Sequence, residues 1–249
     1  YRSNAFELGP RIIVFDYQTS RSGKHVQNFL NKWQGHLLVD DYSGYKALFS
    51  KTASPCTELG CWAHARRKFF DLHQANASTI AFEALQRIGK LYAVEAEGKH
   101  SSTEARQILR AEKSLPILQS LHDWLLQTRF HTADGGGTAK AIDYTLKRWQ
   151  SLIRYASSGY LPIDNNPVEN TIRPIALGKK NWLFTGSERA GKRAAAIQTL
   201  LGTAKLNGLN PAQWLAGTLE KLPTWSNSRI DELLPFAPEA IEALLKECG

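Results

Sequence analysis

The sequence lacks methionine and long apolar runs, and both absences narrow the class of protein. The 249 residues contain no methionine and open with YRSNAFELGP, so we expect a fragment of a longer protein. The longest apolar runs are short ones such as RIIVF and HLLVD, far below the roughly 20 residues that a membrane-spanning helix needs. No charged and then apolar segment opens the chain, so no export signal is indicated.

Cysteine is also scarce. The three cysteines, Cys56, Cys61 and Cys248, are too few for a disulfide scaffold and fit a reducing cytoplasm. A chain of this length is long enough to bury a core of its own. We therefore expect a globular fold that does not depend on disulfides.

Positive charge is what the chain has in excess. Lys and Arg number 31 against 23 Asp and Glu, which gives a net charge of +8 and an isoelectric point near 9.4. Such a balance favours a polyanionic partner, either nucleic acid or an anionic membrane surface. The short apolar runs make the membrane the weaker of these two interpretations.

The order of apolar patterns predicts an α/β start followed by a long helical region. The run RIIVFDYQT (11–19) is typical of a buried strand, SGKHVQNFLNKW (22–33) of an amphipathic helix, and GHLLVDDY (35–42) of a second strand. Strand, helix and strand in this order predict a βαβ unit with a parallel pair. From about residue 60 to 158 the periodicity is helical.

Two aspartates, Asp40 and Asp41, follow the second predicted strand. Ligands and catalytic groups gather at the carboxyl ends of strands in α/β sheets. Aspartate also favours turns, and for this motif alone the turn is the preferred interpretation.

The stretch DNNPVENTIRP (164–174) contains Glu169, for which two roles are open. With Asn166 as N-cap and Pro167 at the first helical position, Glu169 would cap the helix, and Val168 and Ile172 would face the core. Together with Asp40, however, it would supply a pair of carboxylates from distant parts of the chain. Such a pair suits Mg²⁺, which prefers a few carboxylates plus water and phosphate oxygens.

Basic residues are concentrated after Glu169. Between residues 170 and 205 a single acid, Glu188, faces seven basic residues: Arg173, Lys179, Lys180, Arg189, Lys192, Arg193 and Lys205. Trp182 and Phe184 are interleaved with them. Such a segment suits contacts to phosphates and stacking on bases, although a solvated helix face with core aromatics is the common alternative.

A third motif, CTELGCWAHARRKFF (56–70), contains the C-x-x-H pair Cys61 and His64. With Cys56 only three potential ligands are near, whereas a structural zinc site needs four, so zinc is the less favoured interpretation. Burial of Cys61, with Arg66, Arg67 and Lys68 on a basic helix face, is preferred.

The motifs VDDYSGY, CWAHARRKFFD, IDNNPVENTIRPIALGKKNWLFTGS and AAAIQTLLGTAKLNGLNP together closely resemble the transposases of the insertion-sequence-66 family, from about residue 10 to 220. The resemblance implies a bacterial DDE enzyme whose ribonuclease H-like (retroviral-integrase-type) α/β core is interrupted by a large all-helical insertion. We accordingly expect a first core part over 1–54, the insertion over 55–160, completion of the core over 161–208 and a helical tail over 209–249.

The resemblance also implies roles for individual residues. Asp40 and Glu169 would be catalytic and bind Mg²⁺ or Mn²⁺, and Cys61 and His64 would form a structural motif. DNA, as transposon ends and target, would be bound by the basic residues Arg66, Arg67, Arg173, Lys179, Lys180, Arg189, Lys192 and Arg193. The enzyme would work as a homo-oligomer in the bacterial cytoplasm, at the nucleoid.

One element of the family pattern is absent from this sequence. The family's first catalytic aspartate lies on an upstream strand in an Asp-Glu-Thr context that this chain lacks, and Asp16 is not assigned in its place. We therefore expect this chain alone to be inactive or nearly so. The alternative is a DNA-binding remnant or regulator without catalysis.

Overall fold

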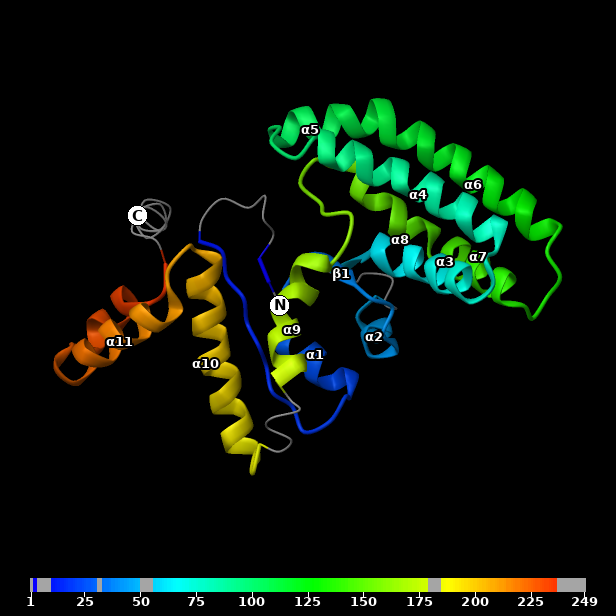
Figure 1. The fold of residues 1–249 in the computed structure, drawn as a ribbon. Helices are drawn as coiled ribbons and strands as arrows, with labels where there is room; N and C mark the ends of the chain where they lie inside the picture. The colour runs from blue at the N-terminus through cyan, green and yellow to red at the C-terminus, as the bar shows by residue number, and fades with distance from the viewer. Residues whose placement is uncertain (1, 4–9, 31–32, 50–55, 179–184, 237–249) are drawn as a thin grey trace. The chain divides into compact units, whose positions relative to one another are not determined.

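The computed structural model describes residues 2–3, 10–30, 33–49, 56–178 and 185–236. These residues form two compact units, one of Ser22–Asn166 and one that combines Tyr1–Arg21 with Pro167–Gly249. Figure 1 labels the helices and strand β1. Within the described ranges no helix has both the length and the apolar composition that crossing a bilayer requires.

The first part of the Ser22–Asn166 unit contains a small parallel sheet. Helix α1 (Gly23–Leu30) precedes strand β1 (Gly35–Val39), which pairs in parallel with β2 (Cys56–Gly60), with Gly35 opposite Cys56 and Val39 opposite Gly60. A short 3₁₀ turn, η1 (Ser43–Tyr45), and α2 (Lys46–Phe49) lie between the strands in sequence.

The structure contains a parallel pair of strands, but not the pair that the sequence predicted. Segment 11–19 forms no strand; within the described residues it makes a single antiparallel bridge, between Ile13 and Arg2. The partner of β1 is β2, in a stretch that the sequence did not mark as a strand. The class is thus mostly helical with a small parallel sheet, and the ribonuclease H-like core stays a prediction.

The rest of this unit is helical, as the periodicity predicted. Its elements are α3 (Trp62–Asn76), α4 (Thr79–Glu97), α5 (Thr103–Leu109), the π-helical turn η2 (Arg110–Ser114), α6 (Leu115–Phe130), α7 (Gly137–Lys147), α8 (Trp149–Ile153) and the 3₁₀ turn η3 (Arg154–Ser157). Ser78 and Ser102 cap α4 and α5 by accepting hydrogen bonds from Ala81 N and Ala105 N. The core includes the fully buried Trp62, Phe69, Ile88 and Leu121.

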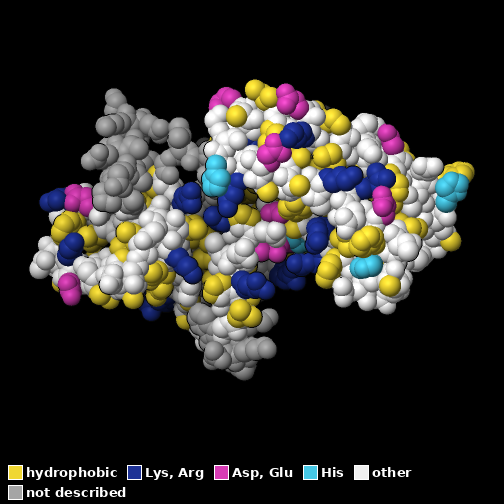
Figure 2. Space-filling model, turned by 45° about the horizontal axis from the view of Figure 1, so that its top comes forward, with side chains coloured by type: hydrophobic (Ala, Val, Ile, Leu, Met, Phe, Trp, Pro, Cys, Tyr) yellow, Lys and Arg dark blue, Asp and Glu magenta, His cyan; other side chains and the backbone are white. Residues whose placement is uncertain are grey.

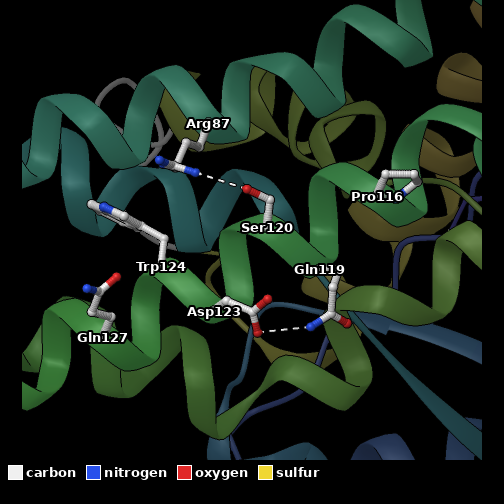
Figure 3. A pocket seen from close by; sticks show the side chains of 7 residues that line it. All are labelled: Arg87, Pro116, Gln119, Ser120, Asp123, Trp124 and Gln127. Atoms are coloured by element: carbon white, nitrogen blue, oxygen red, sulfur yellow. Dashed lines mark hydrogen bonds between the residues drawn. The ribbon is translucent and has the colours of Figure 1, made fainter.

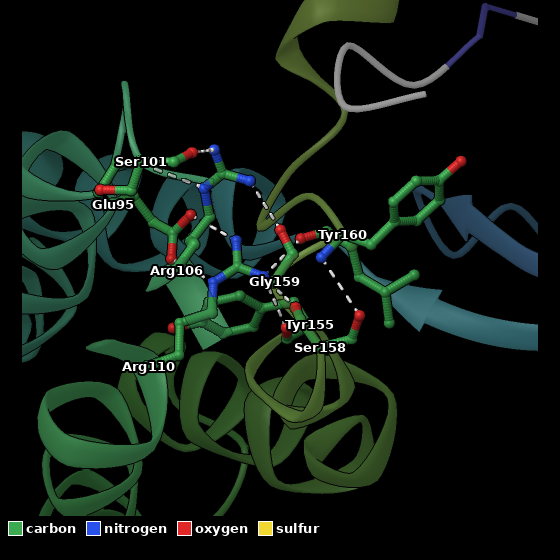
Figure 4. Close-up of polar contacts among 10 residues, drawn as sticks. Glu95, Ser101, Arg106, Arg110, Tyr155, Ser158, Gly159 and Tyr160 are labelled. Atoms are coloured by element: carbon green, nitrogen blue, oxygen red, sulfur yellow. Dashed lines mark hydrogen bonds and ion pairs between the residues drawn. The ribbon is translucent and has the colours of Figure 1, made fainter. Parts of the chain in front are cut away.

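Two buried arginines join the helices of this unit to the segment that follows η3 (Figure 4). Arg110 Nη1 donates to the carbonyl oxygens of Tyr155, Ser158 and Leu161, while its Nε and Nη2 pair with the Glu95 carboxylate at 2.8 and 2.6 Å. Arg106 donates to the carbonyl oxygen of Gly159 at 2.8 Å. Because a charged group is costly to bury without partners, this network fixes the path of residues 155–161.

In the other unit, segment 11–15 is hydrogen-bonded to side chains of α10 (Glu188–Leu206) and of Asn207, the residue that follows this helix. The backbone N–H groups of Arg11, Ile13 and Phe15 donate to the side chains of Asn207, Thr203 and Thr199, at 3.1, 3.3 and 2.9 Å. Alternate residues of an extended chain advance by about 6.8 Å and four helical residues by about 6 Å, so the two spacings match. Segment 11–15 therefore satisfies these donors on a helix instead of in a sheet.

The remaining elements of this unit are also helical. They are α9 (Asn166–Gly178), whose first residue belongs to the other unit, α11 (Pro211–Lys221) and the 3₁₀ turns η4 (Leu222–Thr224) and η5 (Asn227–Leu233). Asn210 caps α11 through hydrogen bonds from Ala212 N and Gln213 N, and Pro211 is its first residue.

Candidate functional site

Asp40 and Asp41 directly follow strand β1, and their side chains lie in different surroundings. Asp40 is exposed, and its Oδ1 accepts a hydrogen bond from Tyr42 N at 3.2 Å, closing a local turn. Asp41 has a φ of 72° and is ion-paired with Arg148, which also binds Glu58 at 2.7 Å. Asp40 thus presents its carboxylate to solvent, whereas the charge of Asp41 is already balanced by arginine.

A second set of residues fixes the start of the DNN stretch. Asp164 is buried, and its Oδ2 accepts hydrogen bonds from Tyr92 Oη and Asn166 Nδ2, both at 2.8 Å. The backbone N–H of Asn166 donates to Asp164 Oδ1 at 3.1 Å. Burial, with the nearby Asp164 charge, raises the pKa of Tyr92, so the phenol stays protonated and donates.

The Cys61 thiol holds the neighbouring residue of that stretch. Its Sγ donates to Asn165 Oδ1 at 2.9 Å and accepts from Asn165 N at 3.4 Å. Burial raises the pKa of Cys61 to about 11, so the group is a thiol at neutral pH and not a thiolate. The first residue of α3, Trp62, adds a backbone hydrogen bond to Ile163 O at 3.1 Å.

Tyr92, Asp164 and Asn165 were not singled out from the sequence. Tyr92 lies 72 residues before its partner Asp164, and Cys61 lies 104 residues before Asn165, so no local pattern announces either contact. The available signal was that C-x-x-H and DNN both stood out as polar motifs. Their contact gives Cys61 a structural role.

Glu169 lies in the first turn of α9 and is half-buried. The helix includes Asn166, so that residue is its first member and not the preceding cap position. The prediction that Val168 and Ile172 face the core is wrong, since they are 36% and 49% exposed. Asp40 and Glu169 belong to different units, so their pairing at one site stays a prediction.

The predicted DNA-binding residues that the structure describes are all exposed. Arg66 and Arg67 lie on α3, Arg173 on α9, and Arg189, Lys192 and Arg193 on α10. Lys192 also pairs with Glu188 at 2.6 Å. Lys179, Lys180, Trp182 and Phe184 lie outside the described residues. Figure 2 shows Lys and Arg side chains exposed on the face in view.

The zinc alternative finds no support in the described part of the chain. There, no three His, Cys, Asp or Glu side chains gather in a way that could hold a metal ion. Cys56 and Cys61 are buried free cysteines, and Cys56 Sγ donates to Trp33 O at 3.5 Å. Both thiols thus serve as hydrogen-bond donors.

A shallow hollow on α4 and α6 provides no evident site (Figure 3). Arg87 donates to Ser120 at 3.2 Å, pairs with Glu83 at 2.8 Å and lies over the Trp124 ring. Gln119 donates to Asp123 at 2.9 Å. Because these polar groups satisfy one another, the hollow has the character of an ordinary surface.

Comparison with known proteins identifies relatives along nearly the whole chain. The family described as "Transposase IS66 family" matches residues 1–193, and the "IS66 C-terminal element" matches residues 199–236. Two Sinorhizobium fredii proteins, "Uncharacterized protein y4hP" and "Uncharacterized protein y4qI", are 36% and 38% identical over 91% and 93% of this chain.

The matched region is 44% of each of these relatives, so the chain spans less than half of their length. No solved structure matches the chain. The family match covers both Asp40 and Glu169 and extends well beyond half of the sequence. The chain belongs to the IS66 transposase family.

Proposed function

We propose that this chain forms the greater part of the catalytic domain of a DNA transposase. Its longer parent would cut DNA at the ends of an insertion element and join them to target DNA, in a complex with more than one copy of the protein. The observation that carries the proposal is the family match over residues 1–193, which includes both candidate acids.

Asp40 and Glu169 would hold Mg²⁺ or Mn²⁺. Asp40 fits this role because it is exposed at the carboxyl end of β1, while the adjacent Asp41 is occupied by Arg148. Glu169, in the first turn of a helix, would be oriented by the start of that helix. When bound, such ions would activate an attacking oxygen and stabilise the leaving one in phosphodiester cleavage.

A third carboxylate would come from outside this sequence. The resemblance places the family's first aspartate on an upstream strand, and relatives more than twice as long as the matched region leave room for it. This chain alone would then bind DNA but cleave it weakly or not at all.

The exposed cations would hold the DNA backbone. Arg173, Arg189 and Arg193 are exposed on α9 and α10 and are suited to phosphate contacts. We expect the logarithm of DNA affinity to fall linearly with the logarithm of salt concentration. Arg189→Ala and Arg193→Ala should each reduce the slope by about one. A flat slope for the unchanged protein would contradict phosphate contacts.

Strand cleavage by the longer parent tests the catalytic part of the proposal. Asp40→Ala and Glu169→Gln should each lower Mg²⁺-dependent cleavage of transposon-end DNA by at least about a hundredfold, through loss of a metal ligand. Glu112→Gln, at an exposed carboxylate of η2, is the matched control and should cleave normally. Undiminished cleavage by Asp40→Ala would remove Asp40 from the site. A parent that binds transposon ends but never cleaves them would favour the regulator.

A further inference from the structure

A cavity of about 250 Å³ lies next to the turn that contains Asp40, within the Ser22–Asn166 unit. Its wall combines aromatic rings, basic groups and two carboxylates. The described residues that line it are Val39, Asp41, Tyr42, Tyr45, Lys46, Phe49, Glu58, Lys147, Arg148 and Ser151. None of the roles assigned above uses the three aromatic rings.

The backbone packs closely at two glycines beside the aromatic wall. Tyr42 and Tyr45 meet edge to face with ring centroids 5.7 Å apart. A Cβ on Gly44 would lie 2.4 Å from the Tyr42 ring, and a Cβ on Gly23 would lie 2.3 Å from Gly44 O. The DYSGY turn is therefore packed too closely at Gly23 and Gly44 for larger side chains.

On the polar wall of the cavity, the positive charge of Arg148 is already paired with two carboxylates. Arg148 is bound by Asp41 and by Glu58 at 2.7 Å, and Ser151 Oγ donates to Arg148 O at 2.8 Å. These pairs leave little positive charge inside the cavity for a phosphate. Lys46 and Lys147 are exposed, so positive charge is available at the surface beside the rings.

We propose that this cavity receives one unpaired base of the DNA, stacked on Tyr45 with its edge towards Tyr42, with Lys46 and Lys147 contacting the adjacent phosphates. Aromatic side chains bind unpaired bases by stacking with little dependence on sequence. Pockets for drug-sized ligands span about 300–1,000 Å³, so this smaller space suits a single base. The two carboxylates disfavour placing a phosphate inside.

The inference rests on the proposed function and deepens it. Tyr42 N donates to Asp40 Oδ1, so the aromatic wall and the candidate catalytic acid share one turn. A base held there would set the register of the DNA strand relative to Asp40. Enzymes that act on DNA hold extruded bases in pockets, and an already unpaired base has the smallest unpairing cost.

The test compares two DNAs that differ by one base. Each is the same duplex with a single unpaired position, occupied by a base in one and by an abasic residue in the other. The 249-residue chain should bind the DNA with the base at least about fivefold more tightly. Tyr45→Ala should lose this preference, and Tyr45→Phe, which keeps the ring, should retain it. Arg189→Ala should weaken both DNAs alike and leave their ratio unchanged.

Photo-crosslinking of the unchanged protein supplies a readout that does not depend on a variant folding. 5-Iodouracil at the unpaired position should crosslink to the peptide that contains Tyr42 and Tyr45. Equal affinity for the two DNAs, or a crosslink confined to other peptides, would overturn this inference while leaving the proposed transposase function intact. Absence of binding to either DNA would overturn this inference together with the expectation that the chain alone binds DNA.

Discussion

At the scale of single residues, two neighbouring aspartates lie in different surroundings. Asp40 faces solvent, whereas Asp41 shares Arg148 with Glu58. Arg148 is itself buried, so its charge needs both carboxylates. The sequence pattern DD does not distinguish the two residues, but their partners do.

Asp41→Asn should therefore lower the free energy of unfolding by about 1–3 kcal/mol, since buried Arg148 loses one ionic partner. Asparagine tolerates the left-handed backbone of that position, so the substitution mainly removes charge. Asp40→Asn, at an exposed position, should change stability by less than about 0.5 kcal/mol. Urea unfolding of the two variants checks this, and equal losses would contradict the distinction.

Cys61 gives a dependence on pH. Burial raises the pKa of its thiol from 9.0 to about 11 in the folded chain. The unfolded thiol loses its proton first, so this contribution is complete below pH 9.0 and is lost as pH rises towards about 11. Cys61→Ala should show a smaller fall in unfolding free energy between these pH values than the unchanged chain. Parallel curves would indicate that the thiol does not contribute.

At the scale of elements, buried arginines connect the helices to the DNN stretch. Arg110, at the start of η2, binds Glu95 on α4 and three carbonyl oxygens of residues 155–161. This segment leads directly to Asp164 and α9. The helical part of the chain thereby positions the residues just before Glu169.

Replacing Arg110 by methionine should cost about 3 kcal/mol or more, because Glu95 and the carbonyl oxygens lose their donor. Lys113→Ala is the matched control from the same turn. It breaks the exposed Lys113–Glu97 pair, 2.5 Å apart, and should cost less than about 1 kcal/mol. Denaturant unfolding of both variants measures the difference. Similar losses of unfolding free energy in the two variants would show that the contacts of Arg110 do not stabilise the fold more than an exposed ion pair does.

The elements that the sequence predicted well are those with regular apolar periodicity. Helices α3 to α8, which lie between about residue 60 and 158, follow that pattern. Segment 11–19 has the composition of a strand, but its N–H donors bind Thr199, Thr203 and Asn207, which the composition does not reveal. Strand β2 was missed because CTELG is short and partly polar.

Only those residues of the candidate site that belong to a recognisable sequence motif could be predicted. Asp40 and Glu169 stood out through their motifs, whereas Tyr92, Arg106 and Arg110 read as ordinary helix-surface residues. Their roles come from partners more than ten residues away, as with Tyr92 and Asp164 or Arg110 and Glu95. Such contacts follow from the packed fold and leave no local pattern.

At the scale of the molecule, the chain consists of two units that are assembled differently from the sequence. The Ser22–Asn166 unit is continuous in sequence and contains the apolar core built around Trp62, Ile88 and Leu121. The other unit combines segments from the two ends of the sequence, joined by hydrogen bonds such as that from Phe15 N to Thr199.

Residues 22–166 expressed alone should therefore fold. We expect a helical circular-dichroism spectrum and one cooperative urea transition, because the large apolar cluster around Trp62, Ile88 and Leu121 is made of residues of this unit. The complementary fragment 167–249 lacks segment 11–15 and should be markedly less cooperative. A non-cooperative transition for 22–166 would show that its core depends on the rest of the chain.

We propose above that Asp40 and Glu169 together hold Mg²⁺ or Mn²⁺, and metal-directed cleavage of the protein tests this most directly. Fe²⁺ in place of Mg²⁺, with ascorbate and peroxide, cuts a polypeptide backbone next to the bound ion. In the longer parent we predict cuts near both residue 40 and residue 169 in the same sample, and loss of both cuts in Asp40→Ala. Cuts near only one of the two residues, or cuts near residue 169 that persist in Asp40→Ala, would contradict a shared metal site.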